Sequence, residues 1–157
     1  MEAKTNKKIV RLPEVDIYDN KPMSKDYINK MRTQLKYDTN YVKIKKTNLR
    51  QNVMWYRIYK ELTITGIEKT FGVHRNEWLK NPSKDVIKVE NKCRYWFAFI
   101  MTNIFNVAYR LLAPELNTIE QNIVHYINYV GDDTSKEARA KYKLLMKNIF
   151  TNERDYQ

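Results

Sequence analysis

The sequence has little glycine, proline and cysteine. Only 3 Gly and 4 Pro occur in 157 residues, which favours long helices over a β fold rich in turns. The single cysteine, Cys93, rules out an intrachain disulfide and a cysteine-based metal site, and its place on an apolar stripe favours a core position. No apolar run suits a transmembrane span, and MEAKTNKKIVRLPEV has no apolar core, so we expect neither a membrane helix nor a secretory signal.

Motifs of catalysis and cofactor binding are also missing. The sequence contains no HExxH, P-loop, GxGxxG or GxSxG pattern. The two histidines, His74 and His125, are far apart, and a structural role is expected for His125. Asp132 and Asp133 fall in an expected turn, where capping explains them. We therefore expect a protein that is not an enzyme and that uses no metal and no cofactor.

Positive charge is abundant and unevenly distributed. The chain has 29 Lys and Arg against 18 Asp and Glu, a net charge of +11, and a pI of about 9.6. Residues 1–60 hold 15 basic and 6 acidic residues (net +9), whereas residues 61–157 hold 14 and 12 (net +2). A lysine-rich codon bias would raise the charge everywhere, so this segregation indicates an anionic partner such as nucleic acid, a membrane surface or an acidic protein.

Two amphipathic helices are expected in the basic half of the chain. Ser24 is the expected N-cap of a helix that ends near Tyr37, and Thr47 is the expected N-cap of one that ends near Leu62. The β-branched residues and glycine of 63–66 (TITG) predict a turn after the second helix. Each helix then has an apolar side and a cationic polar side.

The second half of the chain predicts a compact helical bundle. Residues 67–80 suggest either one helix interrupted at Gly72 or two short turns. The clearer helices are 83–112, capped by Ser83 and stopped by Pro114; 118–131, opened by the capping box Thr118-Ile-Glu-Gln121; and 135–150, capped by Thr134 or Ser135. The predicted fold is therefore all-α: an extended basic N-terminal arm with two amphipathic helices (1–62), then a three- to four-helix bundle (63–157).

The cations of the arm are the candidate nucleic-acid contacts. The only acidic residues between Lys21 and Lys60 are Asp26 and Asp38, although solvated helix faces usually mix both signs of charge. A solvated face is the plainer explanation, but the bias recurs on both helices and on the tail, which suits contact with a phosphate backbone. The candidates are Lys4, Lys7, Lys8, Arg11, Lys21, Lys25, Arg32, Lys36, Lys43, Lys45, Lys46, Arg50 and Arg57.

Aromatic residues follow the second basic cluster. Trp55, Tyr56 and Tyr59 have the chemistry to stack on unpaired bases. They lie mainly opposite the basic side of the helix, however, so we expect them to anchor the arm to the bundle or to a neighbouring subunit.

The segments MSKDYINKMRTQLK and KIKKTNLRQNVMWYRIYK place two cationic helices ahead of a helical bundle. This layout resembles the major coat proteins of filamentous archaeal viruses of the lipothrixvirus and rudivirus group. The resemblance implies a structural protein of the virion that wraps double-stranded DNA without sequence preference. It also implies a dimer with itself or a paralogous coat protein within a helical polymer, and contact with a lipid envelope.

Three other functions remain open from the sequence. One is a sequence-specific transcription regulator that places a recognition helix in the major groove. Another is a small viral inhibitor that binds a host protein, its charge directed at an acidic partner. The third is attachment to an anionic membrane surface through the basic amphipathic helices.

Overall fold

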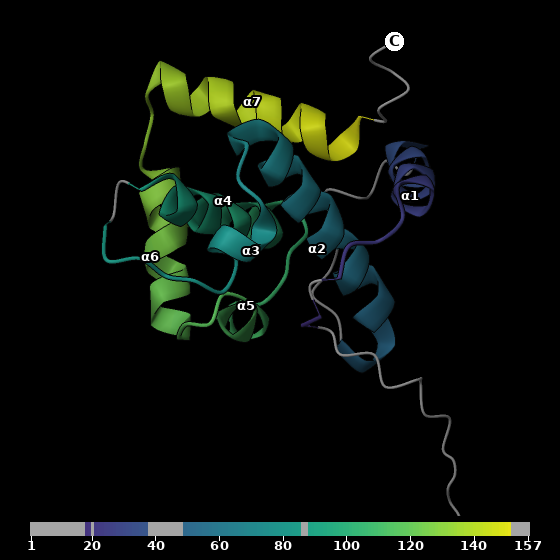
Figure 1. The fold of residues 1–157 in the computed structure, drawn as a ribbon, viewed down its shortest axis with the longest axis horizontal. Helices are drawn as coiled ribbons and strands as arrows, with labels where there is room; N and C mark the ends of the chain where they lie inside the picture. Colours follow the sequence, from purple (N-terminus) through teal and green to yellow (C-terminus); the bar gives the residue numbers. More distant parts are fainter. Residues whose placement is uncertain (1–17, 20, 38–48, 86–87, 152–157) are drawn as a thin grey trace, which may run out of the picture.

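The structure, a computed structural model, describes residues 18–19, 21–37, 49–85 and 88–151, with the backbone alone in 34–37 and 49–54. All regular secondary structure in these residues is helical, which confirms the predicted all-α class. The helices, shown in Figure 1, are α1 (Lys25–Tyr37), α2 (Leu49–Phe71), α3 (Arg75–Trp78), α4 (Val89–Asn103), α5 (Tyr109–Glu115), α6 (Glu120–Gly131) and α7 (Lys136–Phe150).

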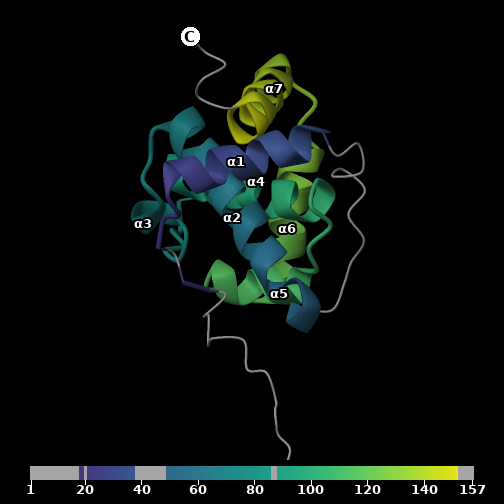
Figure 2. The same ribbon diagram turned by 90° about the vertical axis from the view of Figure 1, so that its right-hand side faces the viewer.

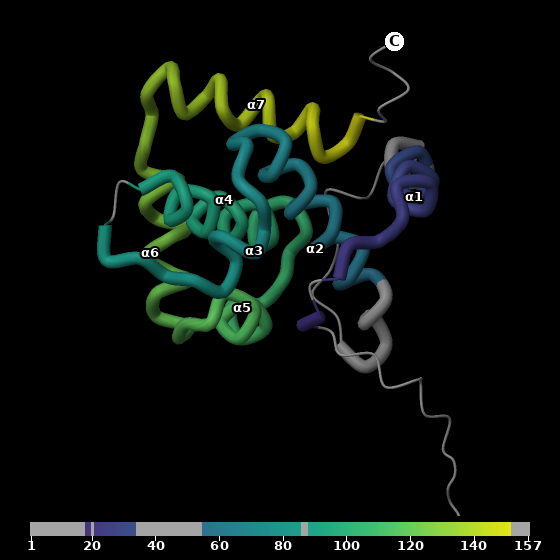
Figure 3. Tube along the Cα trace, viewed as in Figure 1, coloured from purple at the N-terminus to yellow at the C-terminus, as the bar shows by residue number. Residues whose placement is uncertain are grey.

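Helix α2 is the centre of the arrangement. It packs against α7, α4 and α1, while α6 packs against α4 and α5. Figure 2 shows α1 lying across α2 beneath α7, and the tube in Figure 3 traces α4, α5 and α6 on the opposite side of α2. Helices far apart in the sequence are thus joined through α2.

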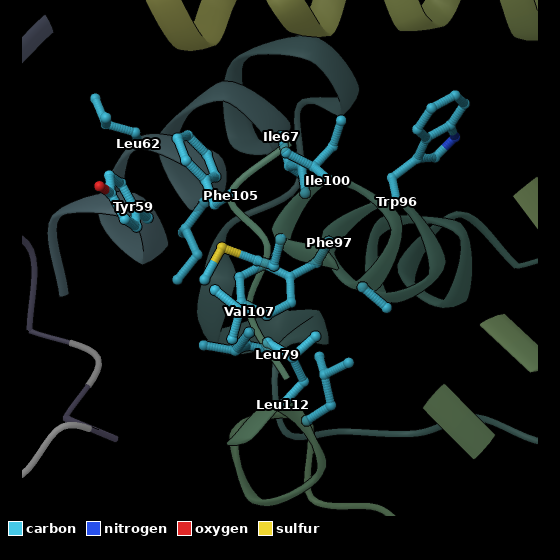
Figure 4. Packing of buried hydrophobic residues seen from close by; sticks show 14 of the residues in the cluster. Tyr59, Leu62, Ile67, Leu79, Trp96, Phe97, Ile100, Phe105, Val107 and Leu112 are labelled. Atoms are coloured by element: carbon cyan, nitrogen blue, oxygen red, sulfur yellow. The ribbon is translucent and has the colours of Figure 1, made fainter. Parts of the chain in front are cut away.

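The core is centred on α2 and α4 and includes residues of α3, α5, α6 and α7. Figure 4 shows Ile67 of α2 beside Ile100 of α4, with Leu62 of α2 near Tyr59 and with Phe97 of α4 on the way to Leu112 of α5 at the opposite end. Apart from Tyr59, these side chains are fully buried. Burying a side chain of this size contributes about 1.5–3 kcal/mol. Helix α6 is supported mainly by its direct packing on α4, and α5 packs on α6.

The turn predicted at 63–66 is wrong, because α2 continues through it to Phe71. The Thr63 hydroxyl donates to the Tyr59 carbonyl at 2.8 Å, so it is satisfied inside the helix. Gly66 is buried where α7 crosses α2, and a Cβ atom there would overlap Cγ1 of Ile149. This glycine permits close helix packing rather than ending a helix, and α2 spans the boundary predicted after residue 62.

The single helix predicted over 83–112 is also wrong, because the chain forms α4 and α5 instead. The N-cap of α4 is Lys88 rather than Ser83. Asn106, between the two helices, has a φ of 57°, a left-handed conformation that a continuous helix excludes. Pro114 lies within the last turn of α5 rather than beyond the helix.

Several helix ends are where the local sequence predicts them. The Ser24 hydroxyl accepts from the Tyr27 amide at 3.2 Å, and the Ser135 hydroxyl accepts from the Ala138 amide at 3.1 Å. These bonds confirm both N-caps. Gly72, with a φ of 71°, separates α2 from α3, which confirms the predicted interruption.

Candidate nucleic-acid interface

Of the thirteen residues predicted to contact nucleic acid, the structure describes the side chains of four. Lys21 and Lys25 are exposed at the start of α1, Arg57 is half-buried on α2, and Arg32 is buried. Backbone alone is described for Lys36 and Arg50, and Lys4, Lys7, Lys8, Arg11, Lys43, Lys45 and Lys46 lie outside the described residues.

Arg32 corrects the prediction of a continuous cationic face on α1. Its side chain is only 7% exposed. Nε donates to the Ile149 carbonyl at 2.9 Å, and the two terminal nitrogens donate to Asn29 Oδ1 at 2.8 Å and Thr65 Oγ1 at 3.0 Å. The guanidinium therefore fastens α1 to α2 and α7, a use that its helical spacing does not reveal.

The aromatic residues of α2 pack within the protein, as predicted. The Tyr59 ring stacks on Phe105 with the ring centroids 4.4 Å apart. The Trp55 ring stacks on Tyr59 with the ring centroids 5.8 Å apart. The Tyr56 hydroxyl donates to Glu115 Oε1 at 2.8 Å. These contacts confirm that the aromatic side of the helix anchors it to the bundle.

Helices α5 and α6 form a helix-turn-helix. They are joined by the four-residue turn 116–119 and pack on each other, while α4 supports α6 from behind. Figure 1 shows α5 nearly end-on and α6 lengthwise, so the two helices cross steeply. Asn117 has a φ of 52° and fills the place that glycine often takes in such a turn.

The turn is fixed by hydrogen bonds and by a buried side chain. Leu116 is fully buried beneath it. The Thr118 amide donates to the Ala113 carbonyl at 2.9 Å, and the Thr118 hydroxyl accepts from Asn122 Nδ2 at 2.8 Å. The predicted capping box is wrong, because Ile119 is the N-cap of α6 and Thr118 belongs to the turn.

One side of α6 is exposed and carries chemistry suited to recognition. Gln121, Val124, His125 and Asn128 recur at three- and four-residue spacings and are exposed, whereas Ile123 on the opposite side is buried. We call these four residues the outward face of α6. His125 was expected to be structural, but its exposure on this face makes it available for contact.

A buried charge cluster holds α5 on α2. Glu115 Oε1 lies 3.0 Å from Lys60 Nζ and accepts from Tyr56, while Lys80 Nζ lies 3.7 Å from Oε2. Burial lowers the pKa of Lys60 by more than the Glu115 carboxylate raises it. Burial and the same carboxylate raise the pKa of Tyr56 well above its usual range. The Glu115 carboxylate thus fixes the first helix of the helix-turn-helix.

Two buried arginines position the neighbouring helices. Arg75 of α3 pairs with Glu61 at 2.7 Å and with Glu68 at 2.9 Å, both on α2. Arg94 of α4 donates to the Leu79 carbonyl at 2.8 Å and to the Tyr126 hydroxyl of α6 at 3.3 Å. Buried cations are thus satisfied in two ways inside the fold: Arg75 by carboxylates and Arg94 by a carbonyl and a hydroxyl.

Helix α7 carries a cationic stripe that the sequence analysis missed. Lys136, Arg139, Lys143 and Lys147 are exposed on its outer side. The signal was present, since these residues are three or four positions apart and Glu137 is the only acid in the helix. Summing the charge over residues 61–157 hid it.

Other kinds of site receive no support from the described residues. No group of His, Cys, Asp and Glu in them is arranged to hold a metal ion, and none of their helices is long and apolar enough to cross a membrane. Cys93 is fully buried, and burial raises the pKa of its thiol to about 12, so it is a core residue, as predicted. Comparisons with protein-family models, with curated proteins and with solved structures find no match.

Proposed function

We propose that this protein is a nonenzymatic binder of double-stranded DNA that inserts α6 into the major groove. The helix-turn-helix is the observation that carries the proposal: its second helix is buried on one side and exposes Gln121, Val124, His125 and Asn128 on the other. In such units the second helix contacts base edges while the first crosses the phosphate backbone. This favours the sequence-specific regulator over the other functions left open by the sequence.

Two cations are placed to help α5 and the turn contact phosphates. Arg110 is exposed on α5. Lys80 lies beside the turn, because its carbonyl accepts from Asn117 Nδ2 at 3.3 Å. Its Nζ donates to the Glu115 carbonyl at 3.3 Å, but the side chain is 38% exposed, so a phosphate would share this cation with Glu115. Since α6 contains no Lys or Arg, its own contacts add little sequence-independent affinity. Binding through this unit alone therefore has a shallow salt dependence, about −2 in log K against log salt for two phosphate contacts.

The test is selection of duplexes from a random library, followed by affinity measurements at one fixed salt concentration. The selected sequence is expected to bind at least about 1,000-fold more tightly than a scrambled one, the lower end of the range typical of specific DNA binding. His125→Ala should reduce that ratio, whereas Asn103→Ala, at an exposed position on α4, should leave it unchanged. Equal affinity for all duplexes, to within about threefold, would refute base recognition by α6.

A second candidate function is sequence-independent coating of DNA, as in the coat proteins that the sequence resembles. The cationic stripe of α7 is the specific observation in its favour, since it adds a phosphate-binding surface to the predicted basic arm. Such a protein would polymerise with itself or a paralogue around DNA in a virion, where an envelope would add lipid contacts. If all the predicted cations of the arm contact phosphates, the salt slope is roughly −12.

Electron microscopy and the salt slope separate the two candidates. Regular filaments on random-sequence DNA, together with a steep slope, support coating. A shallow slope, discrete complexes and one preferred sequence support the helix-turn-helix function.

A further inference from the structure

We propose that the outward face of α6 selects A·T base pairs, an inference that rests on the proposed insertion of α6 into the major groove. The face consists of two amides, an imidazole and a valine. Each base pair presents its own set of donors, acceptors and methyl groups in the major groove, so the side-chain chemistry of a recognition helix limits the bases that it can select.

The contact most often used to recognise guanine is missing from this helix. Arg or Lys donating to O6 and N7 is the commonest specific contact to guanine, and no residue of α6 is Arg or Lys. The only formal charge in α6 is Glu120, which suits the amino group of cytosine but lies to one side of the outward face. The face therefore lacks the bidentate contact to guanine, and the single N–H donor of a neutral His125 imidazole can supply only one hydrogen bond to it.

The contacts that suit adenine are present. Gln121 and Asn128 are exposed on the same side of α6, and Gln and Asn amides can donate to N7 and accept from the N6 amino group of adenine together. Seven residues separate them, which is about 10.5 Å along a helix axis. This distance corresponds to roughly three base-pair steps of about 3.4 Å. We therefore infer two adenines about three base pairs apart.

The apolar member of the face suits thymine. Val124 lies between the two amides along the helix and is 36% exposed, and Ile119 at the N-cap is 60% exposed. Apolar side chains recognise thymine through its C5 methyl group, which cytosine and uracil lack. Exposed apolar atoms between hydrogen-bonding amides match a short run of A·T pairs.

The first experiment is the base composition of the selected duplexes. A·T pairs should occupy the central positions of the preferred sequence, and replacing one of them by a G·C pair should weaken binding by roughly tenfold. A preferred sequence with a G·C-rich centre would overturn this inference and leave the proposed function intact. Absence of binding to any duplex would overturn both.

The second experiment removes a single methyl group from the DNA. Replacing thymine by deoxyuridine at the central positions should weaken binding of the unaltered protein several-fold. Val124→Ala should bind the two duplexes equally, whereas Val89→Ala, which truncates an exposed valine on α4, should keep the difference. If the methyl group has no effect on the unaltered protein, Val124 does not contact thymine.

A gain-of-function variant completes the test. Gln121→Arg supplies the missing contact to guanine, so the preferred base at one position should change from adenine to guanine. Circular dichroism and the urea midpoint check that the variant is folded. A folded Gln121→Arg that keeps the original preference at every position would show that residue 121 does not face the bases.

Discussion

Replacing Glu115 by glutamine tests whether a buried charge holds the helix-turn-helix on α2. Glutamine keeps the size of the side chain and can still accept from the Tyr56 hydroxyl. It removes the negative charge 3.0 Å from Lys60 Nζ, in a place where the Lys60 and Glu115 side chains are 4% and 0% exposed. Lys60 then retains the Asp19 carbonyl at 2.9 Å as a hydrogen-bond acceptor but loses the Glu115 carboxylate.

The expected loss follows from this geometry. Removing one partner of a buried ion pair costs about 3–5 kcal/mol, mostly because the other charge is left unpaired. The remaining carbonyl contact places Glu115→Gln near the lower figure, about 3 kcal/mol. With a urea m-value of roughly 2 kcal/mol/M, the midpoint of unfolding falls by about 1.5 M. Tyr56→Phe, which removes only a hydroxyl donor, should cost less, about 1–2 kcal/mol.

Urea titration followed by tryptophan fluorescence measures these changes, and a second variant identifies their cause. Adding Lys60→Met to Glu115→Gln should restore stability, because it removes the cation that has lost the Glu115 carboxylate. A loss below about 1 kcal/mol in Glu115→Gln, or a double variant no more stable than the single one, would refute the explanation by loss of this carboxylate.

The pH dependence gives an independent check. Burial lowers the pKa of Lys60 in the folded protein below its ordinary value of 10.5. The Lys60 amine then binds more protons in the unfolded chain than in the folded protein. The contribution of Lys60 to stability therefore rises as the pH approaches 10.5, its ordinary pKa. Without the Glu115 carboxylate the pKa falls further. The stability difference between Glu115→Gln and the unaltered protein should therefore shrink from pH 7 to pH 9, and a constant difference would contradict this reasoning.

Two further predictions concern backbone positions. Gly66→Ala should destabilise the protein by about 1–2 kcal/mol through overlap with Ile149. In an Ile149→Ala background the same change should be stabilising, because alanine's helix propensity is then the remaining effect. Urea titration of the unaltered protein, the two single variants and the double variant measures both effects, and stabilisation by Gly66→Ala in both backgrounds would rule out the close packing. Asn117→Gly should be nearly neutral because φ is 52°, whereas Asn117→Val should lower the free energy of unfolding by about 1–2 kcal/mol. Equal thermal midpoints for the two Asn117 variants would contradict the left-handed turn.

The sequence predicted the features that depend on neighbouring residues. The caps at Ser24 and Ser135 need only a hydroxyl three residues before an amide, and the break at Gly72 needs only a glycine that accepts a positive φ. These signals lie within one turn of helix, so periodicity and residue type are enough to find them. The all-α class follows from the same local patterns.

Features that depend on distant contacts were predicted wrongly. Gly66 looked like the end of a helix, because nothing nearby reveals that Ile149 crosses it. Arg32 looked like part of a cationic face, because its acceptors on α2 and α7 are far away in the sequence. A glycine or an arginine can have several structural roles. Which role it has depends on contacts with helices that are distant in the sequence, and the local pattern contains no information about them.

The same reasoning changes how the charge of the chain bears on function. Glu61 and Glu115 are buried in the second half, but so are Arg75 and Arg94, so burial leaves the net charge of the remaining residues of this half at +2. The near-neutral sum over residues 61–157 hides the stripe on α7 because exposed acids elsewhere, such as Asp132 and Asp133, offset it. In the proposed functions, contact with phosphates and selection of bases fall on different helices, and charge counting detects only the first. A search for base recognition has to begin from Gln121, Val124 and Asn128, which carry no charge at all.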